Sequence, residues 1–289
     1  MVNARSRFVW YELMTTNMER AATFYSSVVG WQTRDQSQPG APYVLFTVGG
    51  VSVSGLMDLS AEAWRMGARP SWIGYIGIDN VGASADRIER LGGTVLVPPT
   101  EIPNVSRFSV VADPQGAPVG LLQWLLPSKA QESGLSTVGG VRWHELLAPD
   151  GVAAFRFYGE LFGWQKADTA EGDAGEYQLL SIGGETLGAI FGQRGFVGSA
   201  FWLFYFVVAD IDQAVERVAE GGGKVLEGPT EVPGESWAAH CTDPQGVMFA
   251  LVGKRRRDTG RGVRTIEATW SSQWDGLSLK GRLRIRKRS

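Results

Sequence analysis

An internal repeat constrains the fold of this chain more than any other feature of its sequence. The segment FVWYELMTTNMERAATFYSSVVGW (8–31) returns as VRWHELLAPDGVAAFRFYGELFGW (141–164), so that Trp10 and Glu12 recur 133 residues later. YVLFTVGG then returns as YQLLSIGG at a spacing of 134, and PTEIP and DPQG return as PTEVP and DPQG at a spacing of 130. Small changes of spacing at loops are typical of a duplicated domain. The 289-residue chain is therefore predicted to hold two copies of one module.

The repeat sets the expected domain organisation. We place the modules at residues 5–126 and 141–253, and the polar stretch 127–140 is typical of a linker. The remainder, 254–289, has no repeat partner and carries 12 Lys and Arg against 3 Asp and Glu. We predict a flexible basic tail. The alternating apolar and basic residues of 279–286 leave open a strand on a partner chain or an arm for an anionic surface.

Apolar spacing predicts the same elements in each module, which makes the fold class α+β. A helix with one apolar face is expected from Met18 onward, with a capping box formed by Thr16 and Glu19 and a stop at Gly30. Asp150 replaces that cap in the second module. A second helix is expected after 79–80. Strands are predicted at 43–48, 51–57, 72–78, 107–112 and 118–124.

Composition narrows the class of protein. The formal net charge is −2, and since the tail is basic the modules are acidic, which argues against specific nucleic-acid binding. The chain has no apolar run long enough for a signal peptide or a membrane-spanning helix, which predicts a cytoplasmic protein without a membrane partner. The single cysteine, Cys241, has no disulfide partner and is predicted to be a small buried hydrophobe.

The repeated motifs resemble those of the vicinal oxygen chelate superfamily, which includes glyoxalase I, extradiol dioxygenases and bleomycin-resistance proteins. They are an opening strand with a polar inward position, a helix bearing a Phe-Tyr pair that ends in Gly-Trp, and a closing Asp-Pro-x-Gly strand. The WYELMTT opening and the two-module length are also similar to an actinobacterial glyoxalase-like group often labelled as hydroxylases. The resemblance implies tandem βαβββ modules whose curled mixed sheets form cups, with a divalent metal in the cup of the enzymes.

The residues at the metal-ligand places of the resembled family predict that this chain binds no metal. The first-strand place holds tryptophan, the last-strand place holds glycine or alanine, and the middle strands read Trp-Ile-Gly and Trp-Leu-Phe. None of these side chains can coordinate a divalent cation. The residues at the first-strand and last-strand places are Trp10, Trp143, Gly120 and Ala250.

The histidines offer no replacement metal site. The chain has two, His144 and His240, and a site of two histidines and one carboxylate would need both. Glu145 is the obvious carboxylate, but neighbouring residues of a strand point to opposite faces. We therefore predict no metal and no other cofactor, and interpret His144 as a hydrogen-bonded histidine of the core.

Each cup is instead expected to present an indole beside a carboxylate. Trp10 shares strand parity with Glu12, and Trp143 shares it with Glu145. This pairing suits a flat organic ligand, because an indole offers stacking area and a carboxylate accepts a hydrogen bond or meets a cation. Further candidates for ligand binding lie on predicted strands, and plain core packing stays the alternative for each of them. They are Trp72, Trp202 and Trp237.

Three residues are candidates for catalysis. Glu12 and Glu145 can act as general bases if burial raises their pKa, although a structural hydrogen bond or ion pair is the competing interpretation. His240 has no counterpart in the first module, where Val110 stands, and a polar residue present in one copy alone is expected where a duplicated fold has specialised.

These features lead to three hypotheses of function. The first is a metal-independent protein that binds or tailors an aromatic or polyketide-like metabolite, as a monomer or homodimer. The second is an enzyme, either a lyase or isomerase with Glu12 or Glu145 as base, or a glyoxalase or dioxygenase with an unorthodox metal site. The third is an interaction module that works through the tail, residues 254–289.

Overall fold

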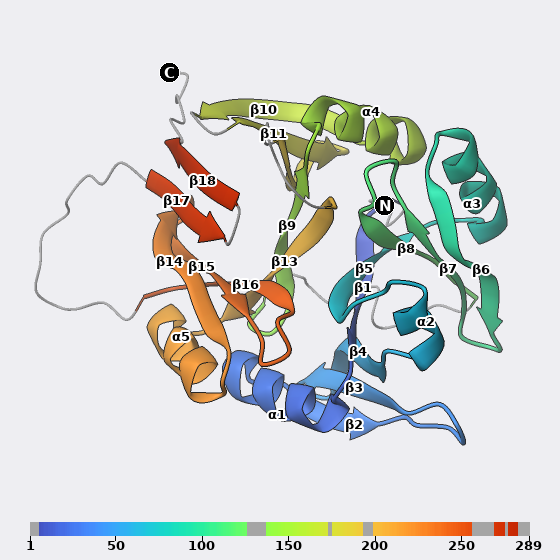
Figure 1. Ribbon diagram of the computed structural model, residues 1–289, viewed down its shortest axis with the longest axis horizontal. Helices are drawn as coiled ribbons and strands as arrows, with labels where there is room; N and C mark the ends of the chain where they lie inside the picture. The colour runs from blue at the N-terminus through green and yellow to red at the C-terminus, as the bar shows by residue number, and fades with distance from the viewer. Residues whose placement is uncertain are drawn as a thin grey trace, which may run out of the picture.

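The computed structural model describes residues 6–125, 137–172, 175–192 and 199–255, and the backbone of two later strands (Figure 1). For residues 168–172 and 175–176, as for those two strands, only the backbone is described. The described part consists of two similar mixed sheets with helices. None of its helices is both long and apolar enough to cross a lipid bilayer.

The first module forms one eight-stranded sheet in the order β2-β3-β4-β1-β5-β8-β7-β6. At its centre β1 runs parallel to β4 and antiparallel to β5, and β5 runs parallel to β8. The sheet has two free edges, so it is not closed into a barrel. Its strands are β1 (Phe8–Thr15), β2 (Gln32–Asp35), β3 (Tyr43–Val48), β4 (Val51–Asp58), β5 (Ser71–Gly77), β6 (Thr94–Ile102), β7 (Ser106–Ala112) and β8 (Pro118–Trp124).

The second module repeats this sheet in the order β10-β11-β12-β9-β13-β16-β15-β14. Here β9 takes the place of β1, parallel to β12 and antiparallel to β13. The equivalent order confirms the two tandem modules that the repeat predicts. Its strands are β9 (Val141–Ala148), β10 (Gln165–Gly172), β11 (Gly175–Ile182), β12 (Glu185–Gly192), β13 (Phe201–Val208), β14 (Lys224–Val232), β15 (Ser236–Thr242) and β16 (Met248–Gly253).

The helices of one module pack against those of the other. In Figure 1, α1 lies beside α5 along the bottom of the molecule, and α4 lies beside α3 at the top.

Each sheet also contains the βαβββ pattern twice, since β1-α1-β2-β3-β4 is followed by β5-α3-β6-β7-β8. The helices are α1 (Met18–Val29), α2 (Ala61–Arg65), α3 (Val81–Arg90), α4 (Gly151–Phe162) and α5 (Ile211–Glu220).

The helix ends follow the expected chemistry with one correction. The N-cap of α1 is Asn17 and not Thr16, because Asn17 has extended backbone (φ −151°) and its side chain accepts from the backbone N–H of Arg20 at 2.9 Å. Gly30 ends the helix at φ 87°, a left-handed conformation that favours glycine. Asp150 caps α4 as predicted.

Two strands of the first sheet were not anticipated from the sequence, and both lie at its edges. In β2 every residue is exposed, so no apolar alternation marks it. β6 contains Pro98 and Pro99, which argue against a central strand. An edge strand tolerates proline because one row of its N–H groups has no partner in the sheet.

One apolar core is shared by the two modules and lies between the sheets and their helices. It includes Leu13, Tyr25, Leu146 and Phe206 from both halves of the chain. The opposite face of each sheet carries its own smaller cluster, and we call these faces the first cup and the second cup. The first contains Trp10, Ile73, Tyr75, Val110 and Leu122, and the second contains Leu147, Leu203, Tyr205, Val207, Ala238, Ala250 and Val252.

The segments outside the modules are described only in part. Of the expected linker, residues 137–140 are described, and Gly139 donates its N–H to the carbonyl of Val207 at 2.8 Å. In the tail, the backbone of β17 (Thr269–Trp274) and β18 (Leu277–Arg282) forms a hairpin beside β14 (Figure 1). The rest of the predicted linker and most of the predicted basic tail lie outside the described residues. The module boundaries at 5–126 and 141–253 stay predictions.

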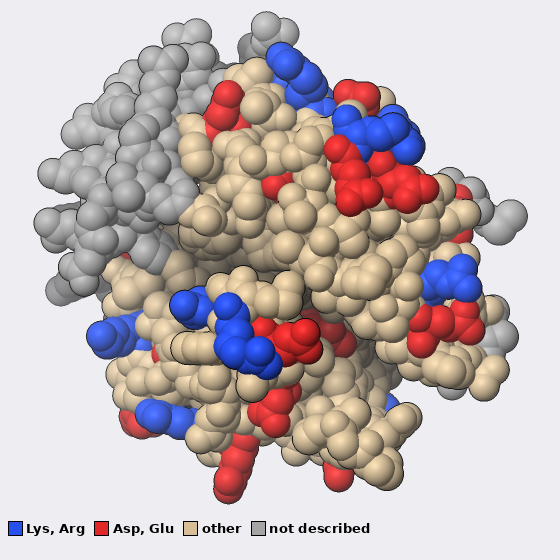
Figure 2. Space-filling model, turned by 45° about the vertical axis from the view of Figure 1, so that its right-hand side comes forward, with Lys and Arg blue, Asp and Glu red and all other residues tan. Residues whose placement is uncertain are grey.

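Charged side chains of both signs are interspersed on the face shown in Figure 2, with wide uncharged stretches between them. A surface of this kind gives no large field of one sign.

Candidate functional site

The alternation of β1 places one tryptophan and one glutamate in the first cup. Trp10 belongs to the cup cluster, whereas Tyr11 and Leu13 belong to the core under the helices. Glu12 therefore shares the face of Trp10, as strand parity predicts. The sheet thus brings an indole and a carboxylate together in the cup.

Two tyrosines hold the carboxylate of the first cup. The hydroxyl of Tyr43 on β3 donates to Oε1 of Glu12 at 2.6 Å, and the hydroxyl of Tyr75 on β5 donates to Oε2 at 2.6 Å. The indole N–H of Trp10 in turn donates to the hydroxyl oxygen of Tyr43. Each oxygen of the carboxylate therefore has a phenolic donor, and the indole is fixed by the same network.

The second cup repeats this arrangement at the equivalent positions. Tyr205 on β13 and Tyr177 on β11 donate their hydroxyls to Glu145, which is 9% exposed. Trp143 donates its indole N–H to the hydroxyl of Tyr177 at 3.2 Å. We call these two sets the tyrosine–carboxylate clusters. They are Trp10, Glu12, Tyr43 and Tyr75 in the first cup and Trp143, Glu145, Tyr177 and Tyr205 in the second.

The second cup holds two further polar groups. Nε2 of His240 lies 2.8 Å from the hydroxyl of Tyr205, and Nδ1 lies 3.5 Å from a carboxylate oxygen of Glu227. His240 and Glu227 face one another across β15 and β14. The predicted candidates Glu145 and His240 are therefore brought into one network by Tyr205.

Burial controls the acid–base properties of the second cluster. It raises the pKa of the Glu145 carboxyl. His240 and the hydrogen bonds from Tyr205 and Tyr177 offset part of this increase, whereas the negative charge of Glu227 adds to it. Burial and the charge of Glu145 also raise the pKa values of Tyr177 and Tyr205 far above the ordinary value. Both tyrosines therefore stay protonated and act as donors at neutral pH.

The cups do not fit the divalent metal of the enzymes in the resembled family. A side-chain carbon added at Gly120 would overlap the ring of Tyr75, so a carboxylate has no room at that place. Ala250 stands at the equivalent place beside Tyr205. In the part of the chain that the structure describes, no group of three or more His, Cys, Asp and Glu side chains is placed to hold a metal ion.

Three of the predicted ligand-binding tryptophans do not join the cups. Trp72 and Trp202 are buried in the core under the helices, because they pair with Leu13 and Leu146, whose side chains face that core. Trp237 also packs against that core, and the guanidinium of Arg255 lies 4.2 Å from its ring. Cross-strand partners share a face, so the register of pairing decides these positions.

The buried tryptophans take part in a reciprocal junction between the modules. Trp202 donates to the hydroxyl of Tyr158 at 3.1 Å, and Tyr158 donates to Asp113 of the first module at 3.2 Å. The same chain of hydrogen bonds also runs from the first module to the second. Trp72 donates to the hydroxyl of Tyr25 at 2.9 Å, and Tyr25 donates to Asp243 of the second module at 3.4 Å. The repeated DPQG motifs therefore serve the junction, through their aspartates.

His144 also lies at the junction, as a buried core histidine. Its Nε2 is 2.6 Å from the hydroxyl of Tyr11, its Nδ1 is 2.8 Å from the carbonyl of Leu187, and its ring stacks on Phe8. Since a carbonyl only accepts, Nδ1 carries the proton and Nε2 accepts from Tyr11. This agrees with the interpretation of His144 as a hydrogen-bonded core residue.

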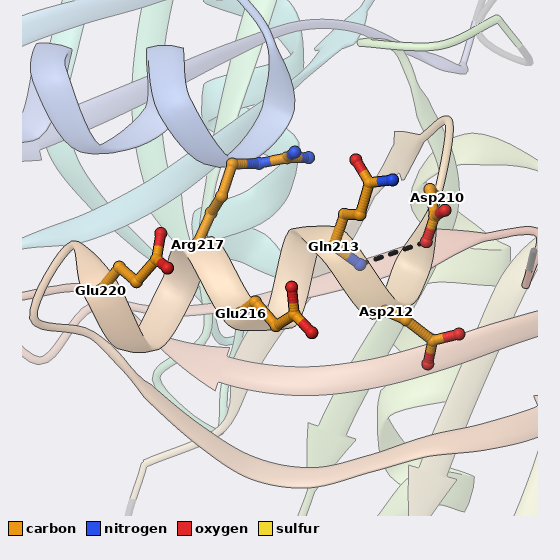
Figure 3. Close-up of a pocket in the computed structure, with 6 residues that line it drawn as sticks. All are labelled: Asp210, Asp212, Gln213, Glu216, Arg217 and Glu220. Carbon is orange, nitrogen blue, oxygen red and sulfur yellow. Dashed lines mark hydrogen bonds between the residues drawn. The ribbon is translucent and has the colours of Figure 1, made fainter.

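A shallow depression on α5 is lined by acidic side chains, Gln213 and Arg217 (Figure 3). Three of its charged side chains have structural partners. Asp210 accepts from the backbone N–H of Gln213 at 3.1 Å, Asp212 pairs with Arg255 at 2.8 Å, and Arg217 donates to a carbonyl of α1. We interpret it as a solvated helix surface.

An apolar cavity of about 240 Å³ lies where the first sheet meets the start of the second module. Trp10, Trp31, Val53 and Phe206 are among its lining residues. It is smaller than common ligand pockets, which measure roughly 300–1,000 Å³. The cups, with their convergent polar groups, remain the stronger candidates.

Five polar residues of the cups were not predicted from the sequence. The four tyrosines recur at the repeat spacings of 134 and 130, so comparison of the two copies carried a signal for them. Glu227 carried a different signal, because Val97 stands at its place in the first module. The missed residues are Tyr43, Tyr75, Tyr177, Tyr205 and Glu227.

Comparison with known proteins agrees with this architecture. The sequence profile of the Glyoxalase/Bleomycin resistance protein/Dioxygenase superfamily matches residues 7–121 and again residues 140–251. The chain belongs to this superfamily. The two matches cover the two sheets, so each module is a superfamily unit.

Among curated superfamily relatives, the protein named "Putative glyoxylase CFP32" of Mycobacterium bovis is 30% identical over 245 residues, which cover 84% of this chain and 93% of that protein. The "Anthracycline biosynthesis protein DnrV" of Streptomyces peucetius is 30% identical over 260 residues, covering 85% of this chain and 92% of that protein.

Solved structures of the superfamily share the fold at low sequence identity. BphC, described as a halotolerant catechol dioxygenase, has a TM-score of 0.61 and 18% identity, and the match covers 96% of both chains. An Mn(II)-bound glyoxalase from Novosphingobium aromaticivorans has a TM-score of 0.58 and 15% identity, with 88% of this chain and 83% of that chain covered. At these identities the likeness concerns the fold alone.

Proposed function

We propose that this superfamily member is a metal-independent protein that binds or tailors an aromatic or polyketide-like small molecule. The observation that carries the proposal is the tyrosine–carboxylate cluster. Each cup has an indole at the first metal-ligand place of the family, and in the first cup a tyrosine ring fills the space at the last one. A small organic ligand therefore meets aromatic and carboxylate groups where the enzymes have a metal.

The chemistry of the cluster suits a flat ligand that carries a hydroxyl or an amine. Indole and phenol rings supply stacking area with little loss of side-chain entropy. The carboxylate has lone pairs beyond those that accept from the two tyrosines, so it can also accept from the ligand. In the first cup Glu12, Leu45, Phe108 and Trp124 are partly exposed, which leaves the cluster within reach of a ligand.

The relatives support the ligand class. One of them is named for anthracycline biosynthesis, and anthracyclines contain fused aromatic rings. We extend that class to this chain as part of the proposal. We also propose that the protein is cytoplasmic and is a monomer or homodimer. Its partner is a small organic ligand and not a membrane or a nucleic acid.

Binding of doxorubicin, a fluorescent anthracycline, tests the proposal. Fluorescence anisotropy of doxorubicin with chelator-treated protein is expected to give saturable binding. Replacing both Trp10 and Trp143 by leucine removes the indoles but keeps apolar bulk, and is expected to weaken binding about tenfold, roughly 1.4 kcal/mol. Trp64→Leu is the control, since Trp64 lies on α2 and is 45% exposed. Absence of saturable binding, or an equal loss in the control, contradicts the proposal.

An enzyme is the second candidate, as a lyase or isomerase in which Glu145 acts as base. The observation that favours it is the network of Glu145 with Tyr205 and His240, together with the raised pKa of Glu145. A metal-dependent glyoxalase or dioxygenase is not favoured, because the cup residues do not fit the metal.

A further inference from the structure

The two cups share their tyrosine–carboxylate clusters, but one pair of facing residues is apolar in the first sheet and polar in the second. In the first sheet Val97 of β6 pairs with Val110 of β7. In the second sheet Glu227 of β14 pairs with His240 of β15. The four positions correspond at the repeat spacing of 130. The first module therefore shows that the fold packs with two valines where the second has a carboxylate and an imidazole.

The polar pair of the second cup extends its cluster into a continuous network. Tyr205 donates its hydroxyl proton to Glu145, so its oxygen can accept from Nε2–H of His240 at 2.8 Å. Nδ1 on the other side of the ring lies 3.5 Å from Glu227. Both ring nitrogens thus face oxygen, and the imidazole connects two carboxylates, one directly and one through a phenol.

Burial makes this network costly to keep. The side chains of His240 and Glu227 are only 11% and 10% exposed. Taking a carboxylate and an imidazole out of water destabilises the folded chain unless they pair well, and a well-packed apolar pair is often as stable. In the first cup the same two places hold Val110, which is buried, and Val97, which is 36% exposed, so the fold does not require a polar pair there. The burial of a carboxylate and an imidazole at these places in the second cup therefore points to a function.

Proton transfer is the chemistry that these groups offer. The side chains of the network are carboxylates, a phenol and an imidazole, which are the usual general acids and bases. Cys241 lies on the other face, in the core, where burial raises the pKa of its thiol to about 12, so it offers the cup no nucleophile.

We infer that Glu145, Tyr205, His240 and Glu227 form an acid–base centre in the second cup, which exchanges a proton with an aromatic carbonyl compound that has an acidic C–H beside the carbonyl. The inference rests on the proposed function and deepens it. Glu145 is the base that touches the ligand. His240 acts through Tyr205, and Glu227 acts through His240, so both are positioning residues.

The step is balanced without a cofactor. The C–H bond beside the carbonyl breaks, its proton moves to the Glu145 carboxylate, and the electron pair remains on the ligand as an enolate. Glu145 then returns a proton to the same carbon, after exchange with solvent protons through Tyr205 and His240. In D₂O the ligand therefore gains deuterium at that carbon, with no net oxidation or reduction.

The probe is 2-tetralone, a fused-ring ketone whose deuterium uptake is followed by proton NMR in D₂O. The full chain is expected to accelerate uptake above the buffer rate. Glu145→Gln is expected to return it to the buffer rate. The double variant Glu227→Val with His240→Val, which copies the pair of the first cup, is expected to lose at least tenfold and to change the pH profile.

Matched controls separate a positioning role from loss of structure. Glu231→Gln changes an exposed glutamate on the same strand as Glu227 and is expected to keep the uptake rate.

A second measurement, proton NMR of the histidine rings, needs no ligand. The chain has two histidines, so their ring resonances can be assigned with single variants. The ring resonances of His240 are expected to shift in Glu227→Gln and in Glu145→Gln, and to keep their positions in Glu231→Gln.

The outcomes distinguish this inference from the proposed function. Quenching of tryptophan fluorescence reports whether 2-tetralone binds. Binding with uptake at the buffer rate overturns the acid–base centre and leaves the proposed function standing. Absence of binding by both 2-tetralone and doxorubicin overturns both. Ring resonances of His240 that are the same in Glu227→Gln as in the natural chain also overturn the centre.

Discussion

Tyr11 and His144 occupy the same position in the two modules, and the Tyr11 hydroxyl lies 2.6 Å from Nε2 of His144. Equivalent residues that touch one another lie where the two modules face each other. The side chains have diverged, so that one donates and the other accepts. This hydrogen bond across the junction therefore requires a neutral histidine, whose Nε2 accepts from Tyr11.

A first prediction concerns pH. Burial lowers the pKa of His144 from 6.5 to about 4, so between these values the unfolded chain binds more protons than the folded one. The free energy of unfolding should therefore fall as the pH falls through this window, and His144 should account for about 2 kcal/mol between pH 7 and pH 5. Urea unfolding at both pH values measures it.

The control for this prediction is His144→Gln. Buried carboxyls with raised pKa values, such as Glu145, add stability of the opposite sign as the pH falls, so only the difference between the two proteins isolates His144. An equal change with pH in both proteins contradicts the prediction.

A second prediction concerns the reciprocal junction. Tyr158→Phe removes the donor to Asp113 and the acceptor of Trp202, all buried. An unsatisfied buried group costs about 1–3 kcal/mol, and Tyr25→Phe should cost a similar amount because it breaks the equivalent chain. Chemical unfolding of the two variants checks this. Losses below about 0.5 kcal/mol in both would show that these bonds do not hold the junction.

A third prediction uses the difference between the cups beside their tyrosines. Gly120→Ala forces a methyl group into the ring of Tyr75 and should cost about 1–3 kcal/mol through overpacking. The reverse change, Ala250→Gly, creates no overlap and should cost about 0.5–1 kcal/mol through backbone entropy. Thermal unfolding of both variants makes the comparison. A Gly120→Ala variant as stable as the natural chain would show that Tyr75 can move aside.

Strand periodicity sufficed for part of the site. Trp10 and Glu12 are two residues apart, so their shared face follows from the period of a strand, and the repeat carries the same conclusion to Trp143 and Glu145. The modules and most of their strands also follow from local patterns, since those patterns occur twice.

Pairing register could not be obtained from the sequence. Trp72 lies opposite Leu13 and faces the core, whereas Tyr75 lies opposite Trp10 and faces the cup. A shift of one residue in the register would have exchanged these roles. The same reason hides the contact of Glu227 with His240, because it depends on how β14 pairs with β15.

Crystallography of the full chain with doxorubicin, recorded above the absorption edges of manganese, iron, nickel and zinc, locates both the ligand and any transition metal ion in the cups. A metal-independent binding protein should show planar ring density against Trp10 or Trp143, with the neighbouring carboxylate within hydrogen-bond distance and no anomalous peak in either cup. A transition ion coordinated by side chains inside a cup would contradict the proposed metal independence.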